Sequence, residues 1–230
     1  MTVFRWPEAG DFLGRVGIAS YFSAAATLKV LGIFETLRNW NTHPGESRML
    51  SLLSDMATLI FLGLVIAVAA FRLRPSKSAS GIEPRLTALA GTFLLVFLTL
   101  LPPSQSPPTI ATILGLCFAI AGSLLSAYVL LWLGRSFSIV PEARRLITGG
   151  PYGIVRHPLY MTEELATIGI VLLHWSLIAV ALACLQLGLQ LRRMYIEEKV
   201  LGAAFPEEYA AYAKRTPRFV PGRCLARQPA

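Results

Sequence analysis

The sequence predicts an all-α fold: a polytopic transmembrane helical bundle. Hydrophobic residues make up 54% of the chain and charged residues only 15%. The mean hydropathy of +0.58 lies far outside the usual balance of a soluble globular domain. Apolar runs of membrane-spanning length recur along the chain. Basic residues collect at the ends of these runs, where they orient a membrane protein and contact anionic headgroups.

The net charge of +8 therefore indicates membrane lipids as partners and no nucleic acid. The three cysteines, Cys117, Cys184 and Cys224, have no paired spacing. We expect neither a disulfide framework nor a metal site from them. The oligomeric state is not predicted.

Four apolar runs come first, at residues 16–37, 49–71, 86–101 and 110–133. Gly115 and Gly122 in the fourth run are small enough to let a neighbouring helix approach closely. Lys29, Glu35 and Asp55 interrupt the first two runs, and they either pair between helices or extend toward the membrane surface. Nothing in the sequence assigns chemistry to these three residues.

The last apolar run, residues 165–191, is too long for one span of about 20 residues and too short for two. The loop after the second run is basic, whereas the loop "PPSQSPPT" after the third run carries no charge, so the former is expected in the cytoplasm and the latter outside. A single crossing would place the strongly basic C-terminal tail outside. A hairpin with His174 and Trp175 at its apex, extended by residues 158–164 and 192–201, keeps the tail inside. We therefore expect six membrane segments with both termini cytoplasmic.

This hairpin brings the stretches "GPYGIVRHPLYMTEE" (150–164) and "RRMYIEEKV" (192–200) to its open mouth. Arg156 and His157 come just before a helix that Pro158 can start, where free backbone N–H groups attract anions. The other candidate residues are two ionisable groups four apart on one helical face, further carboxylates and aromatic rings: Arg193, Glu197, Glu198, Glu163, Glu164, Tyr152, Tyr160 and Tyr195. Together these groups suit a zwitterionic ligand with a flat ring and a positive centre.

Each residue also has an ordinary interpretation. His157 alone is more often a capping or hydrogen-bonded structural residue. Glu197 and Glu198 on a helix with neighbouring arginines are typical of a solvated face. Glu163 and Glu164 are harder to explain in this way, because ionisable groups near a membrane are costly and usually have partners.

The run "LGRSFSIVPEARRLITGGPYGIVRHPLYMTEEL", followed after the hairpin by "RRMYIEEKVLGAAFPEEYAAYAKRTPRFVP", resembles the isoprenylcysteine carboxyl methyltransferase family and its bacterial relatives among membrane phospholipid methyltransferases. The resemblance covers roughly residues 132–221 and rests on the ordered elements G-P-Y, R-H-P-x-Y, E-E and F-x-x-E-Y-x-x-Y. It implies methyl transfer from S-adenosyl-L-methionine, held in a cytoplasm-facing pocket roofed by the C-terminal segment. It also implies a lipophilic acceptor that enters from the bilayer between helices.

The resemblance implies cofactor-pocket roles for His157, Tyr160, Arg193, Glu197 and Glu198. With the candidates from residue chemistry, the expected cofactor site comprises Tyr152, Arg156, His157, Tyr160, Glu163, Glu164, Arg193, Glu197 and Glu198, with Arg193 and Glu197 as the catalytic, positioning pair. Residues 134–230 are expected to form the cofactor region, and residues 1–133 the scaffold and substrate access. The stretch "MTEEL" replaces a glycine found in many relatives, which bears on helix packing or substrate choice. The acceptor stays open between a carboxylate, an amine, a thiol and another lipid or small molecule.

Two alternatives remain. Membrane sterol reductases carry similar G-P-Y and R-H-P-x-Y elements, which allows an NADPH-dependent lipid reductase, although such proteins are usually longer. A small transporter or a non-catalytic membrane subunit would also accommodate charges inside the membrane, but the two halves show no inverted repeat.

Overall fold

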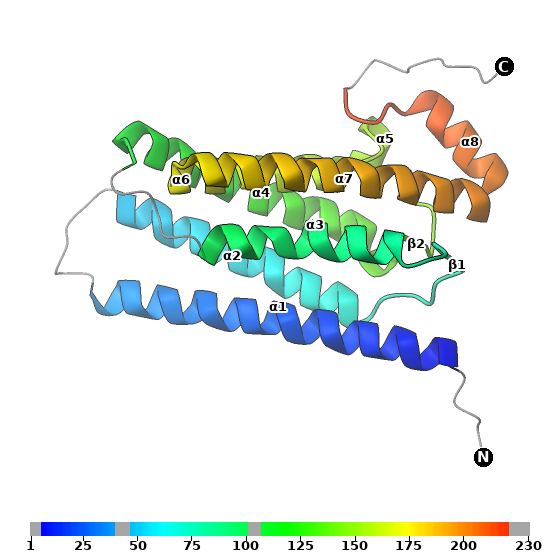
Figure 1. Cartoon of the computed structure of the whole chain (residues 1–230), viewed down its shortest axis with the longest axis horizontal. Coiled ribbons are helices and arrows are strands. Elements are labelled where there is room, and N and C mark those ends of the chain that lie inside the picture. Colours follow the sequence, from blue (N-terminus) through cyan, green and yellow to red (C-terminus); the bar gives the residue numbers. More distant parts are fainter. Residues whose placement is uncertain (1–5, 40–46, 101–106, 221–230) are drawn as a thin grey trace.

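A computed structural model of the chain describes residues 6–39, 47–100 and 107–220. Six long helices run in alternating directions along one common axis (Figure 1). They are α1 (Trp6–Arg38), α2 (Ser47–Ala70), α3 (Glu83–Leu100), α4 (Thr109–Leu133), α6 (Pro158–His174) and α7 (Leu177–Ala204). The predicted all-α membrane fold is confirmed, and α1 extends further toward the N-terminus than the apolar run suggested.

Short elements lie together at one end of the bundle (Figure 1). They are the strands β1 (Lys77–Ser78) and β2 (Glu142–Ala143), the 3-10 turn η1 (Gly134–Ser136), and the short helices α5 (Pro151–Ile154) and α8 (Pro206–Arg215). β1 and β2 pair antiparallel, with Lys77 opposite Ala143 and Ser78 opposite Glu142. This pairing ties the loop after α2 to the loop after α4.

The hairpin of α6 and α7 is as predicted. α6 ends at His174, and Trp175 takes the left-handed conformation, with φ of 44°, that stops the helix. Ser176 then caps α7, because its side chain accepts a hydrogen bond from the Ala179 backbone N–H. The start of α6 at Pro158 and the continuation of α7 to Ala204 confirm that both arms extend beyond the apolar run.

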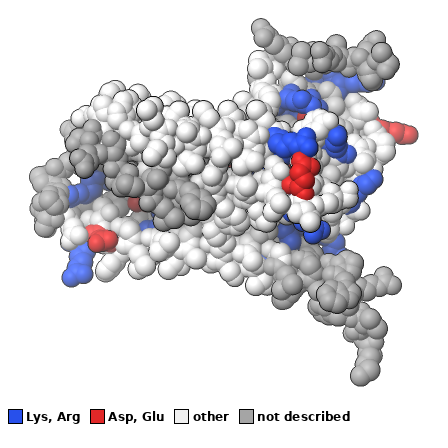
Figure 2. Space-filling view, in the orientation of Figure 1, with Lys and Arg blue, Asp and Glu red and all other residues white. Residues whose placement is uncertain are grey.

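Among the described residues, four helices are long and apolar enough to cross a membrane by length and composition: α1, α2, α4 and α7. The prediction of six crossings also counts the shorter helices α3 and α6, and it stays a prediction. Charged side chains gather on the end of the molecule that holds α8, while the visible middle of the bundle is almost uncharged (Figure 2). Most of the loop "PPSQSPPT", as well as Cys224 and the last arginines, lies outside the described residues.

The closest helix packing is between α4 and α6. A Cβ atom at Gly122 would collide with the backbone of Ala166, and one at Gly115 would collide with Leu173 and the Gly169 carbonyl. The predicted close approach at these two glycines is confirmed. Because backbones in such contact cannot slide or rotate freely, α4 determines which face α6 presents to the other helices.

Candidate functional site

A polar pocket, here called the outer pocket, lies at the end of the bundle where the α6–α7 hairpin opens. The loop after α4, α5, the first turn of α6, the second half of α7, and α8 contribute its walls. Its lining residues with charged or aromatic side chains are Phe137, Glu142, Arg145, Tyr152, Arg156, His157, Tyr160, Arg193, Glu197 and Tyr212. Six of the nine predicted cofactor residues therefore face one pocket.

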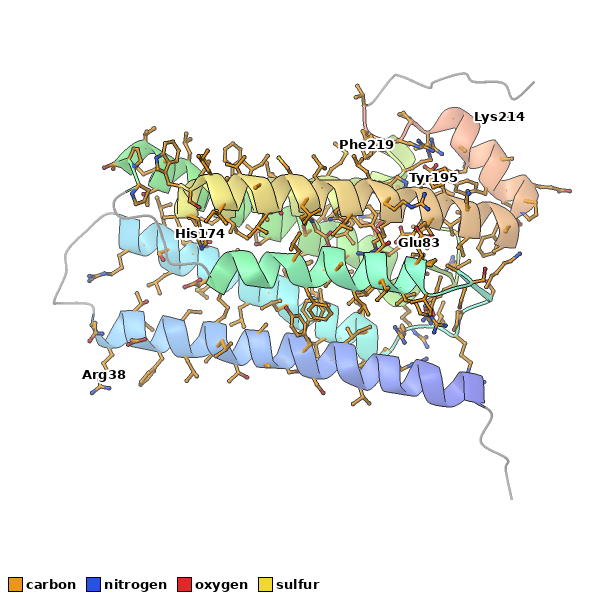
Figure 3. The ribbon with its side chains drawn as sticks, in the orientation of Figure 1. Arg38, Glu83, His174, Tyr195, Lys214 and Phe219 are labelled. Atoms are coloured by element: carbon orange, nitrogen blue, oxygen red, sulfur yellow. The ribbon has the colours of Figure 1, made fainter. Side chains whose placement is uncertain are left out.

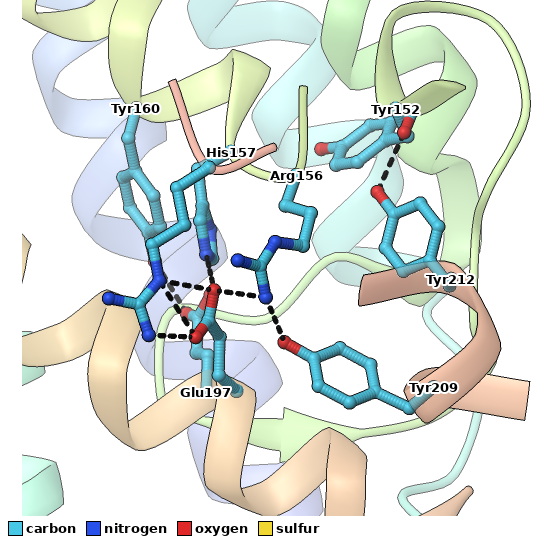
Figure 4. Close-up of polar contacts among 9 residues, drawn as sticks. Tyr152, Arg156, His157, Tyr160, Glu197, Tyr209 and Tyr212 are labelled. Carbon is cyan, nitrogen blue, oxygen red and sulfur yellow. Dashed lines mark hydrogen bonds and ion pairs between the residues drawn. The ribbon is translucent and has the colours of Figure 1, made fainter. Parts of the chain in front are cut away.

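Arg193, Glu197 and Tyr160 form one contact group in the wall of the outer pocket, and Figure 4 shows Tyr160 and Glu197. Glu197 Oε1 lies 3.3 Å from Arg193 Nε and accepts a hydrogen bond from the Tyr160 hydroxyl. The Arg193 guanidinium stacks on the Tyr160 ring, 5.1 Å from its centroid, and donates a 3.1 Å hydrogen bond to the Ser138 carbonyl. These contacts hold both charged groups in one orientation.

Glu198 has a different environment from its neighbour Glu197. Glu198 is buried and contacts three basic side chains. Arg156 Nη1 lies at 3.0 Å, His157 Nε2 lies at 3.1 Å, and Arg218 makes a bidentate contact. Bidentate arginine–carboxylate pairs are among the stronger polar contacts in proteins. Glu198 lies outside the set of residues that line the outer pocket. It anchors the C-terminal segment instead.

The C-terminal segment, α8 with residues 216–220, borders the outer pocket through Tyr212, and Figure 4 shows its Tyr209 and Tyr212 beside Arg156 and Tyr152. The Tyr212 hydroxyl donates a 2.7 Å hydrogen bond to the Tyr152 carbonyl, and the Arg156 backbone N–H donates a 2.8 Å bond to the Pro217 carbonyl. Arg156 Nη1 also donates to the Tyr209 hydroxyl at 3.4 Å. The segment is thus bound to the "GPYGIVRHP" loop at two points, Tyr152 and Arg156.

Burial raises the pKa values of three tyrosines where α5 meets the C-terminal segment. Burial raises the pKa of Tyr209 to about 12, and the nearby Glu198 carboxylate adds to the rise. Burial also raises the pKa of Tyr212 and, well above its ordinary value of 10.0, that of Tyr152. All three phenols are therefore neutral hydrogen-bonding groups at physiological pH.

The local sequence explains how this loop enters the site. Gly150 has φ of 57° and ψ of −133°, and a Cβ atom there would collide with the Trp132 ring. Only glycine adopts this conformation without strain. Pro151 then starts α5, and Pro158 starts α6 with His157 as its N-cap residue. The predicted position of Arg156 and His157 before a helix N-terminus is confirmed.

A second and larger cavity, here called the inner cavity, lies inside the helical bundle. Its volume is about 480 Å³, against about 110 Å³ for the outer pocket. All six long helices contribute to its wall, including Phe22 and Lys29 of α1 and Thr92 of α3. Most of the wall is apolar, and polar side chains interrupt it at Ser54, Thr58, Ser123, Ser126, Thr167, Gln186 and Gln190.

Glu163 faces the inner cavity and is not part of the outer-pocket wall. Its Oε2 accepts a 3.0 Å hydrogen bond from Gln190 Nε2 of α7. Among the described residues, Glu164 lines neither cavity, and its buried Oε1 has no hydrogen-bond partner. The two adjacent glutamates, which the sequence placed in one group, thus occupy different environments.

The outer pocket and the inner cavity share part of their walls. Phe137, Leu159, Tyr160 and Arg193 line both. We call these four residues the junction. A group held in the outer pocket and one held in the inner cavity would therefore meet beside Tyr160 and Arg193.

Sequence reasoning missed several contributors and misplaced one. Arg218, Gln190 and Ser138 contact predicted residues, and no motif identified them. Tyr209 and Tyr212 belong to the F-x-x-E-Y-x-x-Y element, whose spacing was the available signal. Tyr195, expected among the site's rings, is 43% exposed and contacts Arg192 and Lys199 on the outside of α7 (Figure 3). That expectation was wrong because Tyr195 lies on the opposite helical face from Arg193.

Comparison with known proteins supports the sequence resemblance. Residues 110–208 match the model of a family described as phospholipid methyltransferase. This match begins at α4, so a helix expected to belong to the part for scaffold and substrate access lies within the family region. The stretch carries the family's sequence signature, and the resemblance to membrane methyltransferases is confirmed over this part of the chain.

Three curated relatives match part of the chain. Protein-S-isoprenylcysteine O-methyltransferase B of Arabidopsis thaliana is 34% identical over 113 residues, covering 46% of this chain and 57% of the relative. The cobalt-zinc-cadmium resistance protein CzcN of Cupriavidus metallidurans is 40% identical over 83 residues, 36% of this chain and 38% of the relative. The nickel-cobalt-cadmium resistance protein NccN of Alcaligenes xylosoxydans is 33% identical over 87 residues, 37% and 40% respectively. The matched stretches thus span about two fifths to under three fifths of these relatives' lengths.

Proposed function

We propose that the protein is an integral membrane methyltransferase that uses S-adenosyl-L-methionine and acts on a lipophilic acceptor. The observation that carries this proposal is the junction, where a charged pocket at one end of the bundle meets a mostly apolar cavity between the helices. A polar donor and an apolar acceptor can approach one another there from opposite sides. The family match over residues 110–208 supports the same chemistry.

The residues of the outer pocket fit the cofactor. Arg145, Arg156 and Arg193 offer cationic groups for its carboxylate, while Glu142 and Glu197 offer carboxylates for its ammonium and sulfonium. Aromatic walls suit the adenine ring and the sulfonium. Within the described part of the chain, the buried Nε atom of Arg156 has no hydrogen-bond partner, so this donor is left for a ligand.

The size of the outer pocket adds a requirement. Its volume of about 110 Å³ is below the roughly 300–1,000 Å³ of ordinary ligand sites. Admission of the cofactor therefore needs the pocket to widen. The C-terminal segment is the wall attached by few side-chain contacts, chiefly Tyr212 with Tyr152 and Arg218 with Glu198. We propose that this segment moves outward when the cofactor enters.

Arg193 and Glu197 have a positioning role in this proposal. Glu197 is oriented by Arg193 and by the Tyr160 hydroxyl, so that its carboxylate stays at one place on the pocket wall. Bound S-adenosyl-L-methionine supplies a sulfonium-activated methyl group for in-line displacement. Orientation and the exclusion of water supply roughly 7–11 kcal/mol of rate acceleration in favourable cases. Tyr160 and Arg193 would contact both the methyl donor in the outer pocket and the acceptor in the inner cavity, so they are placed to orient the two reactants.

The acceptor lies in the inner cavity in this proposal, and Glu163 lies beside it. A carboxylate acceptor is already ionised and needs no base. An amine, thiol or hydroxyl acceptor must lose a proton, and Glu163 is the carboxylate that lines the inner cavity close in sequence to Tyr160. His157 faces only the outer pocket and Glu164 faces neither cavity, so Glu163 is the base proposed for a protic acceptor.

The proposed orientation follows the charge distribution. The outer pocket, α8 and the start of α1 lie at the same end of the bundle, and charged side chains gather there (Figures 1 and 2). We propose that this end, with both termini, faces the cytoplasm. Residues 134–230 would then hold the cofactor, while the helices of residues 1–133 complete the acceptor cavity.

The competing functions have less support. Neither the family description nor the methyltransferase relative supports NADPH-dependent reduction or transport. Two relatives are named for metal resistance, but in the described ranges no cluster of three or more His, Cys, Asp or Glu side chains is placed to hold a metal ion. Membrane methyl transfer therefore remains the better-supported proposal.

Calorimetry on detergent-purified protein tests the cofactor. We expect S-adenosyl-L-methionine and S-adenosylhomocysteine to bind, NADPH not to bind, and Glu197→Gln to lose the binding. Glu207→Gln, on the exposed surface of α8, is the matched control and should bind normally. Binding of NADPH alone would favour the reductase, and binding of none of these ligands to folded protein would overturn the proposal.

A further inference from the structure

An ion pair between the first two helices borders the inner cavity and has no role in the chemistry proposed above. Lys29 Nζ of α1 lies 2.6 Å from Asp55 Oδ1 of α2. Both residues stand inside helices that are apolar and long enough to cross a membrane. Ionisable residues at such positions are costly, and they commonly mark a binding site or a transport path.

Lys29 also belongs to the wall of the inner cavity, beside Ser54 of α2. His174, the last residue of α6, lines the same cavity. Figure 3 places His174 at the end of the bundle opposite Tyr195 and Glu83, which lie toward the outer pocket. The cavity therefore has polar groups at both extremes, with apolar wall between them.

The cavity is elongated along α6. Its lining residues on that helix include Tyr160, Glu163, Thr167, Ile170 and His174, which are three or four positions apart and so form one continuous helical face. Tyr160 and His174 are about 21 Å apart along the helix axis, at 1.5 Å per residue. An extended single-chain lipid fits this shape better than a compact ligand.

Lys29 lies nine residues before Arg38, the last residue of α1, and Figure 3 places Arg38 and His174 at the same end of the bundle, so this distant end offers both a donor and an acceptor of hydrogen bonds. An ammonium group has three N–H donors, and Asp55 uses one of those of Lys29. His174 Nδ1 lies 2.9 Å from the Ile170 carbonyl, so this nitrogen is the donor of that bond and Nε2 is left as an acceptor in the neutral ring. The Lys29–Asp55 pair is neutral as a whole, so an added carboxylate would bring an uncompensated charge into the membrane layer.

We propose that Lys29, held by Asp55, and His174 form a recognition site for a neutral hydrogen-bonding group, a hydroxyl above all, at the far end of an elongated lipid. This inference rests on the proposed function, because it assumes that the inner cavity holds the acceptor with its reacting end at the junction. The lipid acceptor would then carry a polar group at each end. A hydrocarbon chain without the distal group would fill the cavity but leave these hydrogen bonds unmade.

Two probes that differ only at one end test the site: 1,16-hexadecanediol and 1-hexadecanol. Their dissociation constants are measured by native mass spectrometry of the full chain released from detergent, without any methyl donor. We expect the wild-type protein to bind the diol about tenfold more tightly, the effect of one added hydrogen bond to a charged group. The double variant Lys29→Met/Asp55→Leu, which leaves no unpaired charge, should bind both probes equally.

Two further variants separate recognition from structure. Arg192→Met removes a comparable pair, Arg192–Glu83, which is exposed and does not line the cavity, so the preference for the diol should persist. His174→Phe keeps the ion pair and should reduce the preference even if the double variant fails to fold. Equal binding of the two probes by the wild type, or an unchanged preference in both His174→Phe and the folded double variant, would overturn the proposal and leave the ion pair as a link between helices.

The outcome is separable from that of the methyl donor test. If the diol preference is present but calorimetry detects no S-adenosyl-L-methionine binding, the lipid site stands and the methyltransferase proposal fails. If the cofactor binds but the preference is absent, methyl transfer stands and the distal recognition site is overturned.

Discussion

The outer pocket and the inner cavity meet at four residues but are built in different ways. One continuous stretch of the sequence, from Leu133 at the end of α4 to Tyr160 in the first turn of α6, forms most of the outer pocket, and α7 and α8 complete its wall. The inner cavity takes a few residues from each of six helices that are far apart in the sequence. The charged pocket is therefore visible as a motif, whereas the cavity that would select the acceptor is not.

Arg193→Met changes a residue that lines both the outer pocket and the inner cavity, so we expect it to have the largest effect on cofactor binding. Arg193 is buried against Glu197, Tyr160 and the Ser138 carbonyl. Its loss leaves the partly buried Glu197 carboxylate without its arginine partner, a change that costs about 3–5 kcal/mol in pairs that are fully buried. Cofactor binding by calorimetry should weaken at least about 100-fold.

The neighbouring Arg192→Met is the control for this prediction. Arg192 pairs with Glu83 at the exposed surface, where an ion pair contributes about 0–1 kcal/mol. Equal losses in the two variants would mean that the effect comes from the charge of α7 as a whole and not from the junction.

Glu163→Gln separates the inner cavity from the outer pocket. If the acceptor is protic, methyl transfer should fall by about 10²–10⁴-fold, while cofactor binding stays unchanged because Glu163 does not line the outer pocket. Radiolabelled methyl transfer to amine, hydroxyl and carboxylate lipids measures the first quantity, and calorimetry measures the second.

Glu164→Gln, one residue along the same helix, should leave transfer nearly unchanged because Glu164 lines neither cavity. Full transfer by Glu163→Gln to an amine or hydroxyl lipid would exclude Glu163 as the base. If the wild-type protein methylates carboxylate lipids only, no base is needed.

Gly122→Ala tests whether the inner cavity depends on the close contact of α4 with α6. The added methyl group would collide with the Ala166 backbone, and overpacking of this kind costs about 1–3 kcal/mol. Gly63→Ala in α2 is the matched control, since a Cβ atom there meets nothing within 4 Å. The control should keep or raise the free energy of unfolding by up to about 1 kcal/mol, as measured by titration with SDS. Equal stability of both variants would contradict the described packing.

The smallest effect is on thermal stability, concerns the C-terminal segment beside the outer pocket and appears only at alkaline pH. The pKa of Tyr209 is raised from 10.0 to about 12 in the folded protein. A raised folded-state pKa means that the stabilising contribution is complete below pH 10 and is lost as the pH rises through about 12. Tyr209→Phe should therefore show a smaller loss of thermal stability between pH 10 and 12 than the wild type. Tyr128→Phe, at an exposed position on α4, is the control and should follow the wild-type curve, and coincidence of all three curves would refute this assignment.

Much of the outer pocket could be predicted because its chemistry is local. Pro158 favours a helix start through its own backbone geometry, independently of tertiary contacts. The four-residue spacing of Arg193 and Glu197 likewise puts them on one helical face. Tyr195 shows where this reasoning ends, since helix geometry places it opposite Arg193 but does not say which face is covered. That depends on the helices packed against α7.

The acidic pairs give the same lesson. Glu163 and Glu164 are equivalent in the sequence, but contact with α4 turns Glu163 toward the inner cavity and Gln190. Glu197 and Glu198 likewise separate, the first toward Tyr160 and the second toward Arg218. Adjacent residues on a helix point about 100° apart, so neighbours in sequence join different sites.

The sequence by itself determined the membrane class, the helices and the hairpin, because hydropathy, length and charge act along the chain. It also identified six residues that line the outer pocket, because they cluster in two short stretches. Tertiary structure alone decided that Tyr160 and Arg193 border two cavities, that Lys29 pairs with Asp55, and that α8 packs against α5 beside the outer pocket. These features arise from contacts between distant helices, where close packing of small residues decides which faces meet.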